Sequence, residues 1–253
     1  MERDGAPNGG PSTSSTSLLQ PHFFHLLPGQ TPGRFALGGY RPQDARDPAI
    51  AGERCHIRRD QTPGGSGMDV KEAIRGRRTV KRYAARPIHS STLEALLELA
   101  VWAPNHRMTE PWSFRVLGPE AKRFYGETLG RLRARKVDDP AVAETLRRRS
   151  IENALATPAT LAFLQRLDPD PGIREEDYAA IYMGIQNLLL GATADGLVAQ
   201  VKTGPVLEDP AFRAALDVSD GERVVALVHL GEALETPSPR PRTPAVERTH
   251  WLA

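Results

Sequence analysis

The chain has 253 residues, of which 25% are charged and 40% apolar, and its formal net charge is +2. This composition is typical of a soluble globular protein with one domain and a tail, or with two small domains, and the charge is too small to indicate a nucleic-acid surface. The single cysteine, Cys55, excludes an intramolecular disulfide. No apolar run reaches the roughly 18 residues of a membrane helix. We therefore expect a cytoplasmic protein with neither membrane nor nucleic acid among its partners.

The first 67 residues differ in composition from the rest of the chain. Of these residues, 28 are Pro, Gly, Ser or Thr, and few large apolar side chains remain to offset the entropy of ordering the backbone. We expect residues 1–67 to form a disordered tail and residues 68–253 to form the folded domain. The alternative is that translation begins at Met68 and that the upstream reading frame is over-extended. The possible metal ligands of this stretch are His22, His25, Cys55 and His56. Their spacing matches no zinc-binding pattern, so no metal site is expected.

From Met68 onward the apolar pattern predicts helices interleaved with strands. The expected helices lie at 70–74, 93–100, 119–136, 141–153, 175–196 and 210–216, and the expected strands lie at 112–117, 159–164, 197–202 and 223–230. The helix at 175–196 carries apolar residues on nearly all sides, which predicts that it is buried in the domain or at a subunit interface. Gly196 is expected to end it as a C-terminal cap. Ser90, Ser91 and Thr92 predict the N-terminal cap of the helix at 93–100.

Two basic segments are candidates for binding a phosphate group. The segment from Arg77 to Arg82 holds four cations beside the hydroxyl of Thr79, and guanidinium forks bind phosphate oxygens in pairs. The alternative is that these cations only neutralise the negative end of a helix. Arg240 and Arg242 form a second basic group in a proline-rich segment, where the alternative is a solvated linker.

Histidines and nucleophile motifs offer little chemistry of their own. Glycine-rich phosphate loops, a serine nucleophile elbow and a zinc-binding His-Glu-x-x-His motif are absent from the sequence. We expect His89 to be a surface loop residue and His229, on a predicted buried strand, to be a hydrogen-bonded core histidine. No catalytic side chain is therefore expected, and a cofactor would carry the chemistry.

Several motifs in register resemble those of the FMN-dependent nitroreductases of the small, single-domain bacterial type. The run Arg-Arg-Thr-Val-Lys-Arg-Tyr at 77–83 resembles the family's Arg-Arg-Ser-x-Arg-x-Phe signature. Residues 103–114 resemble its Ala-Pro…Gln-Pro-Trp-x-Phe loop and strand, and residues 183–192 look like its central dimer helix. The segments 202–204 and 230–232 fit in the same order, so the resemblance covers about residues 68–251.

The resemblance implies an α+β fold with a mostly antiparallel central sheet wrapped by helices, and a homodimer with two FMN sites at the interface. It also implies that NADH or NADPH is the co-substrate. Hydride would pass to FMN and electrons then to a small electrophilic acceptor, such as a nitroaromatic or quinone, in a ping-pong mechanism. The rival hypothesis is a non-enzymatic flavin- or nucleotide-binding protein with a basic interaction surface in the arginine-rich helices 131–149. We expect those arginines to form a solvated helix face instead.

The family's site residues carry over position by position. Arg77, Arg78 and Thr79 would hold the phosphate and the ribityl chain of FMN. Arg240 or Arg242 would close on the phosphate. Val201, Lys202 and Thr203 would line the flavin, while Trp102 and His106 would approach it from the partner chain. Four positions depart from the family's pattern: Thr79 replaces Ser, Lys81 replaces Arg, Met108 replaces Asn and Glu110 replaces Gln.

Overall fold

The computed structural model describes residues 67–252, so the predicted disordered tail, except for Gly67, lies outside the described residues. The helices of this part are α1 (Val70–Gly76), α2 (Ser90–Val101), α3 (Pro119–Ala134), α4 (Pro140–Ala156), α5 (Pro171–Ala194) and α6 (Pro210–Ala215). The strands are β1 (Trp112–Val116), β2 (Ala159–Arg166), β3 (Val198–Lys202) and β4 (Glu222–Gly231). Short 3-10 turns lie at His106–Met108, Pro205–Glu208 and Ala245–Arg248.

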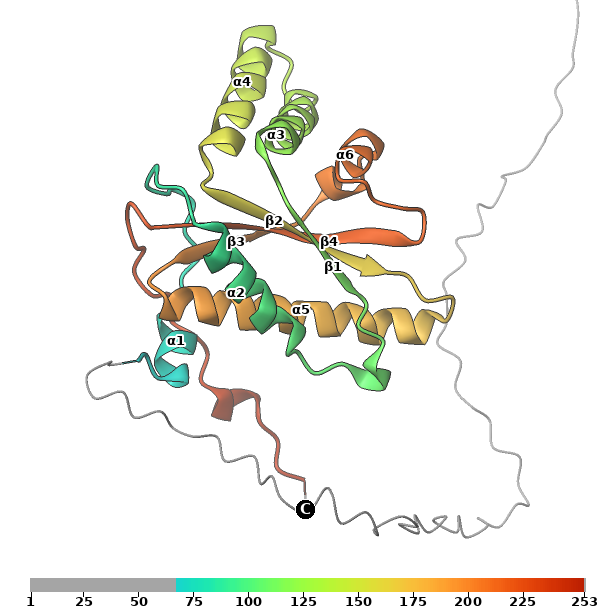
Figure 1. Cartoon of the computed structure of the whole chain (residues 1–253). Helices are drawn as coiled ribbons and strands as arrows, with labels where there is room; N and C mark the ends of the chain where they lie inside the picture. The colour runs from blue at the N-terminus through green and yellow to red at the C-terminus, as the bar shows by residue number, and fades with distance from the viewer. Residues whose placement is uncertain (1–66, 253) are drawn as a thin grey trace, which may run out of the picture. The chain divides into compact units, whose positions relative to one another are not determined.

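One antiparallel sheet organises this part of the chain. Its strand order is β1-β2-β4-β3, so the last strand in the sequence lies between β2 and β3. Figure 1 shows α2 and α5 on one side of the sheet and α3, α4 and α6 on the other. The predicted α+β architecture, a mostly antiparallel central sheet wrapped by helices, is confirmed.

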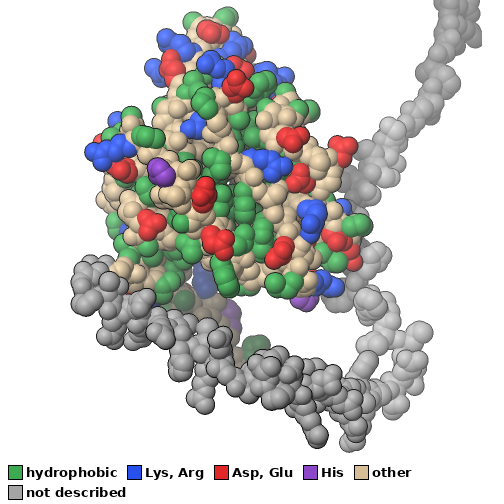
Figure 2. All heavy atoms as spheres, viewed as in Figure 1, with side chains coloured by type: hydrophobic (Ala, Val, Ile, Leu, Met, Phe, Trp, Pro, Cys, Tyr) green, Lys and Arg blue, Asp and Glu red, His purple; other side chains and the backbone are tan. Residues whose placement is uncertain are grey.

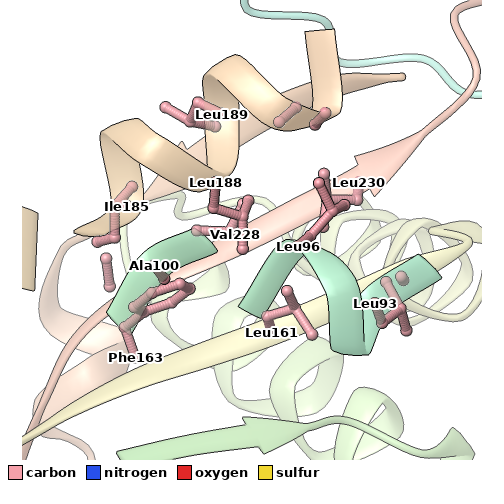
Figure 3. Close-up of a cluster of buried hydrophobic side chains, with 14 of the residues drawn as sticks. Leu93, Leu96, Ala100, Leu161, Phe163, Ile185, Leu188, Leu189, Val228 and Leu230 are labelled. Atoms are coloured by element: carbon pink, nitrogen blue, oxygen red, sulfur yellow. The ribbon is translucent and has the colours of Figure 1, made fainter. Parts of the chain in front are cut away.

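The larger apolar core fills the space between the sheet and the pair α2–α5. Leu161 and Phe163 from β2 and Val228 and Leu230 from β4 are at most 1% exposed, and Figure 3 shows them meeting side chains of both helices. Gly184 permits the close approach of these helices, because a Cβ atom there would lie 2.8 Å from the carbonyl oxygen of Ala100.

Helix α5 differs from the prediction in its start and in its exposure. It begins at Pro171 rather than 175, because the Asp170 carboxylate accepts hydrogen bonds from the first free backbone N–H groups, including that of Gly172 at 2.7 Å. The single chain does not bury the helix on all sides, since Tyr178 is 36% and Met183 40% exposed, and the predicted alternative of a subunit interface stays a prediction. Gly196 does follow the helix with a φ of +74°, as predicted.

Helix α2 is also capped differently from the prediction. His89 is its N-cap residue, and its Nδ1 atom accepts a hydrogen bond from the backbone N–H of Ser91 at 3.3 Å. His89 is exposed and lies in the loop directly before the helix, as predicted, whereas the cap residue predicted at 90–92 is one to three residues late. An imidazole nitrogen here does the work that a serine or aspartate oxygen usually does.

The hairpin of α3 and α4 carries the arginine-rich stretch. Ion pairs engage Arg131 with Asp209 at 2.7 Å and Arg147 with Glu144 at 3.1 Å. Figure 2 shows basic and acidic side chains mixed over this end of the molecule. On the face shown, this mixture is what a solvated helix face has. No helix within residues 67–252 is both long and apolar enough to cross a membrane.

We predict that Gly184→Ala destabilises the fold by about 1–3 kcal/mol, because the added Cβ atom would press on the backbone of Ala100 and force the two helices apart. Urea denaturation followed by circular dichroism measures the loss. Gly76→Ala is the matched control, since a Cβ atom there would meet nothing within 4 Å. Equal stability of the two variants would contradict the close packing of α2 on α5.

Candidate functional site

The basic segment after α1 is held against the edge of the sheet. The backbone leaves the helix at Arg77, and Thr79 then forms a parallel bridge with Ala199 of β3. The backbone N–H of Val80 donates to the carbonyl of Ala199 at 3.4 Å, and Val80 is only 3% exposed. Buried Val80 thus anchors the segment, so that the cations on either side of it are presented beside β3.

A cavity of ≈1210 Å³, here the first cavity, opens between this segment and the extended chain after β4. Its lining brings together five of the residues predicted to bind phosphate, which are Arg77, Arg78, Thr79, Arg240 and Arg242. The two arginine groups are more than 160 positions apart in the sequence. Their convergence places several guanidinium groups and a hydroxyl around one volume, which is the donor set that suits a phosphate.

Arg78 also has a structural role within α1. Its Nη1 atom donates to the carbonyl oxygens of Arg75 at 2.6 Å and of Arg77 at 3.0 Å. These carbonyls belong to the helix end, where the backbone carries partial negative charge. The helix-end explanation therefore applies to Arg78. Because a guanidinium has five N–H donors and these bonds use only Nη1, other donors of Arg78 are left for a ligand.

A second cavity, of ≈440 Å³, adjoins the first and shares Lys81 and Arg82 with it. Lys202 of β3, Arg133 of α3 and His229 of β4 also line it, and none of its lining residues is acidic. The pKa of Lys202 is lowered by burial first and then by the nearby charges of Arg133 and Lys81. The second cavity is therefore a positive environment with no carboxylate in its walls.

His229 is the most unusual residue of the second cavity. It is 6% exposed, and its Nε2 atom forms no hydrogen bond with the residues at 67–252. The ring of Tyr125 stands edge-on to it, with centroids 5.6 Å apart. Burial, followed by the charges of Lys202 and Lys122, lowers the pKa of His229 to about 4. The imidazole is thus neutral at pH 7. The predicted core position of His229 is confirmed, but the predicted hydrogen bonding is wrong for Nε2.

The remaining predicted site residues lie elsewhere. Val201 points to the opposite face of the sheet from Lys202 and packs against the larger core. Thr203 follows β3 and is exposed. Trp102, which is 77% exposed, and exposed His106 lie between α2 and β1 and line neither cavity. The single chain therefore unites the predicted phosphate residues but separates them from Trp102 and His106.

The loop that carries His106 has an uncommon backbone. Arg107, Met108 and Glu110 have positive φ angles of 68°, 50° and 45°, a region that residues other than glycine seldom adopt. His106 Nδ1 lies 2.9 Å from an oxygen of Glu176 on α5. The pKa of Glu176 is lowered, mainly by the hydrogen bond from His106 and further by the charge of His106.

Residues that the motif analysis missed hold this loop in place. The side-chain oxygen of Asn105 accepts from the backbone N–H of Glu110 at 2.7 Å. The hydroxyl of Thr109 donates to the carboxylate of Asp177, which is only 2% exposed. The signal in the sequence was Asp177 itself, an acidic residue in the helix at 175–196. It lies four positions before the apolar residue Ile181 and therefore on the same helix face. No cluster of metal-ligating side chains occurs in the part of the chain that the structure describes.

Comparison with known proteins gives a consistent result. The nitroreductase family model matches residues 74–232. The Bacillus subtilis (strain 168) protein "Putative NAD(P)H nitroreductase YfhC" is 31% identical over 180 residues, which cover 71% of this chain and 92% of that relative. The solved nitroreductase-like family protein from Bacillus cereus is 27% identical with a TM-score of 0.65, over 74% of this chain and 98% of that one.

A more distant solved structure has the same fold. The FMN and NADPH-dependent nitroreductase NfnB from sphigopyxis sp. strain HMH gives a TM-score of 0.59 over 74% of this chain and 100% of that one. Its sequence identity is 18%, so this likeness is evidence for the fold alone.

We predict that Thr109→Val lowers the free energy of unfolding by about 1–3 kcal/mol, because the buried carboxylate of Asp177 loses its hydroxyl donor. Chemical denaturation measures the loss. Thr145→Val makes the same chemical change on α4, where the hydroxyl donates only to the backbone carbonyl of Ala141 one turn earlier. This control should change the free energy of unfolding by less than about 0.5 kcal/mol. If both variants lose equally, Asp177 does not anchor the loop.

Proposed function

Because the chain belongs to the nitroreductase family, we propose that it is an FMN-dependent oxidoreductase whose cofactor phosphate occupies the first cavity. When bound, FMN would accept a hydride from NADH or NADPH and deliver electrons to a small electrophilic acceptor such as a nitroaromatic or quinone. The carrying observation is the convergence of Arg77 and Thr79 with Arg240 and Arg242 around one volume.

The donor chemistry of the first cavity fits a phosphate monoester. A dianion needs several charge-assisted hydrogen bonds, and guanidinium groups supply them in pairs. Arg77 forms no ion pair with any residue at 67–252. The Thr79 hydroxyl adds a neutral donor next to β3. Replacement of the family's Ser by Thr79 keeps that hydroxyl.

From the phosphate in the first cavity, the flavin ring would extend along the edge of the sheet toward the second cavity. The two cavities adjoin at Lys81 and Arg82, and the end of β3 borders the second cavity through Lys202. In this arrangement Lys202 and Thr203 line the ring, while Val201 supports the strand from the core side. The chain's own work is to hold, orient and shield the ring, and no side chain need act as acid or base.

A second copy of the chain would complete the site. Exposed apolar side chains lie on the face of α2 and α5, with Leu99 42%, Trp102 77% and Met183 40% exposed. Figure 2 shows hydrophobic side chains gathered near the middle of the face over these helices. Covering them in a homodimer would remove apolar surface from water and could bring the partner's loop, with Trp102 and His106, toward the flavin. A ping-pong mechanism follows, because both half-reactions would use one ring face.

The absorption spectrum of the purified chain tests this proposal directly. We expect flavin bands after FMN is supplied, and we expect these bands to bleach when NADH or NADPH is added without oxygen and to return with a nitroaromatic or quinone. A protein that gains no flavin bands would contradict the proposal. Bound flavin that bleaches with neither nicotinamide would instead indicate a non-enzymatic flavin-binding protein.

We predict that Arg77→Gln weakens FMN binding roughly ten- to hundredfold, which corresponds to about 1.5–3 kcal/mol for a hydrogen bond to a charged group. Riboflavin, which lacks the phosphate, should bind both proteins equally well. Fluorescence titration of the apoprotein measures both affinities. Arg77 is a better target than Arg78, whose guanidinium also caps α1.

Arg123→Gln is the matched control, because Arg123 is exposed on α3 and lines neither cavity. It should leave both affinities unchanged. Equal losses for FMN and riboflavin in Arg77→Gln would show that the residue supports the fold and does not contact the phosphate.

A further inference from the structure

The second cavity gathers more positive charge than its surroundings neutralise. Lys81, Arg133 and Lys202 line it, and none of them has a carboxylate partner within salt-bridge distance among residues 67–252. Arg133 is held across the cavity by donating to the hydroxyl of Ser150 on α4 at 3.2 Å, and Ser150 is 1% exposed. Lys202 is half-buried, whereas Lys81 and Arg133 are exposed. Burial and the neighbouring positive charges therefore disfavour the charged form of Lys202, and a bound anion would favour it.

His229 gives an independent sign of a missing partner. A buried polar atom that loses its hydrogen bond costs about 1–3 kcal/mol, and its Nε2 atom is in that state among the described residues. Cross-strand neighbours Thr160 and Gln200 flank it on the sheet, and Gln200 also lines the cavity. An apolar residue would fill this place at no such cost. The histidine is therefore explained if an occupant, directly or through one water molecule, completes its hydrogen bonding.

We propose that the second cavity binds a planar, delocalised anion, for which Lys202 and Arg133 supply the opposite charge and the imidazole of His229 a neutral hydrogen bond. Two sources have this chemistry. One is the pyrimidine edge of a reduced flavin, and the other is a carboxylate on an aromatic acceptor. The identity of the source rests on the proposed function, whereas anion binding by the cavity does not.

Binding of small aromatic probes to the apoprotein tests the site without a flavin. 4-Nitrobenzoate and its neutral counterpart 4-nitrobenzamide have nearly the same shape, so calorimetry on the two isolates the effect of the charge. We expect the wild type to bind 4-nitrobenzoate at least tenfold more tightly and Arg133→Gln to remove the preference. Arg135→Gln, which removes an exposed charge one residue beyond the end of α3 and does not line the cavity, should keep it.

No preference for the anion in the wild type, or the same loss in Arg133→Gln and Arg135→Gln, would overturn the proposal. A wild type that prefers 4-nitrobenzoate but binds no FMN would refute the proposed function and leave the anion site standing. The two ideas can therefore fail separately.

Repeating the titration with saturating FMN distinguishes the two sources. If the reduced flavin ring is the anion, FMN will abolish 4-nitrobenzoate binding, whereas inorganic phosphate, which should occupy only the first cavity, will not. Arg133→Gln should then reduce the preference for reduced over oxidised flavin about tenfold, which is about 30 mV for a two-electron couple. If the acceptor's carboxylate is the anion, 4-nitrobenzoate binding will survive FMN and the flavin potential will not move.

His229→Leu tests the hydrogen-bonding role. We expect weaker 4-nitrobenzoate binding together with an apoprotein melting temperature that is unchanged or higher, because an apolar side chain of similar size leaves no unsatisfied nitrogen. A lower melting temperature with unchanged probe affinity would show that His229 serves only in packing, and would remove it from the proposed site.

Discussion

The pairing of the basic segment with the edge strand β3 is the constraint on which the candidate site depends. Val80 is buried and its N–H group donates to Ala199, so the cations before and after it are set on either side of a fixed point. Those before it face the first cavity and Lys81, immediately after it, lines both. Because β3 is itself fixed by five register pairs with β4, the position of the site follows from the sheet and not from a flexible loop.

The site lowers the free energy of unfolding of the single chain in two ways, through unfavourable electrostatics and through a missing hydrogen bond. Cations converge around both cavities. The pKa of Lys202 is lowered because burial and the nearby positive charges disfavour its charged form. His229 remains neutral for the same reasons, with a pKa lowered to about 4. A fold selected only for stability would place carboxylates or apolar groups here. One buried nitrogen without a hydrogen-bond partner among residues 67–252, together with a set of cations without carboxylates around the second cavity, is what a protein shows where a site is not optimised for stability.

The sequence predicted the fold class and the order of the elements, because these depend on local periodicity. Clustered charge singled out the two arginine groups, which the structure brings to the lining of the first cavity. It did not predict the second cavity, which arises where α3, β3 and β4 meet and so depends on tertiary packing. The start of α5 was missed because Asp170 caps a helix whose first turn has no apolar pattern. The sequence did not decide between burial of α5 in the domain and at a subunit interface, because an apolar helix looks the same in sequence whether a core or a second chain covers it.

The loop at 105–110 combines an unfavourable backbone conformation with hydrogen bonds that hold it in place. Left-handed conformations at Arg107, Met108 and Glu110 cost roughly 1–2 kcal/mol each. A surface connection could avoid that strain, yet a buried carboxylate on α5 holds this one in place through Thr109. The same helix bears the exposed apolar side chain of Met183. A strained, anchored loop beside an open apolar face is suited to present fixed groups to another molecule, and a second copy of the chain would place them where the first copy lacks them.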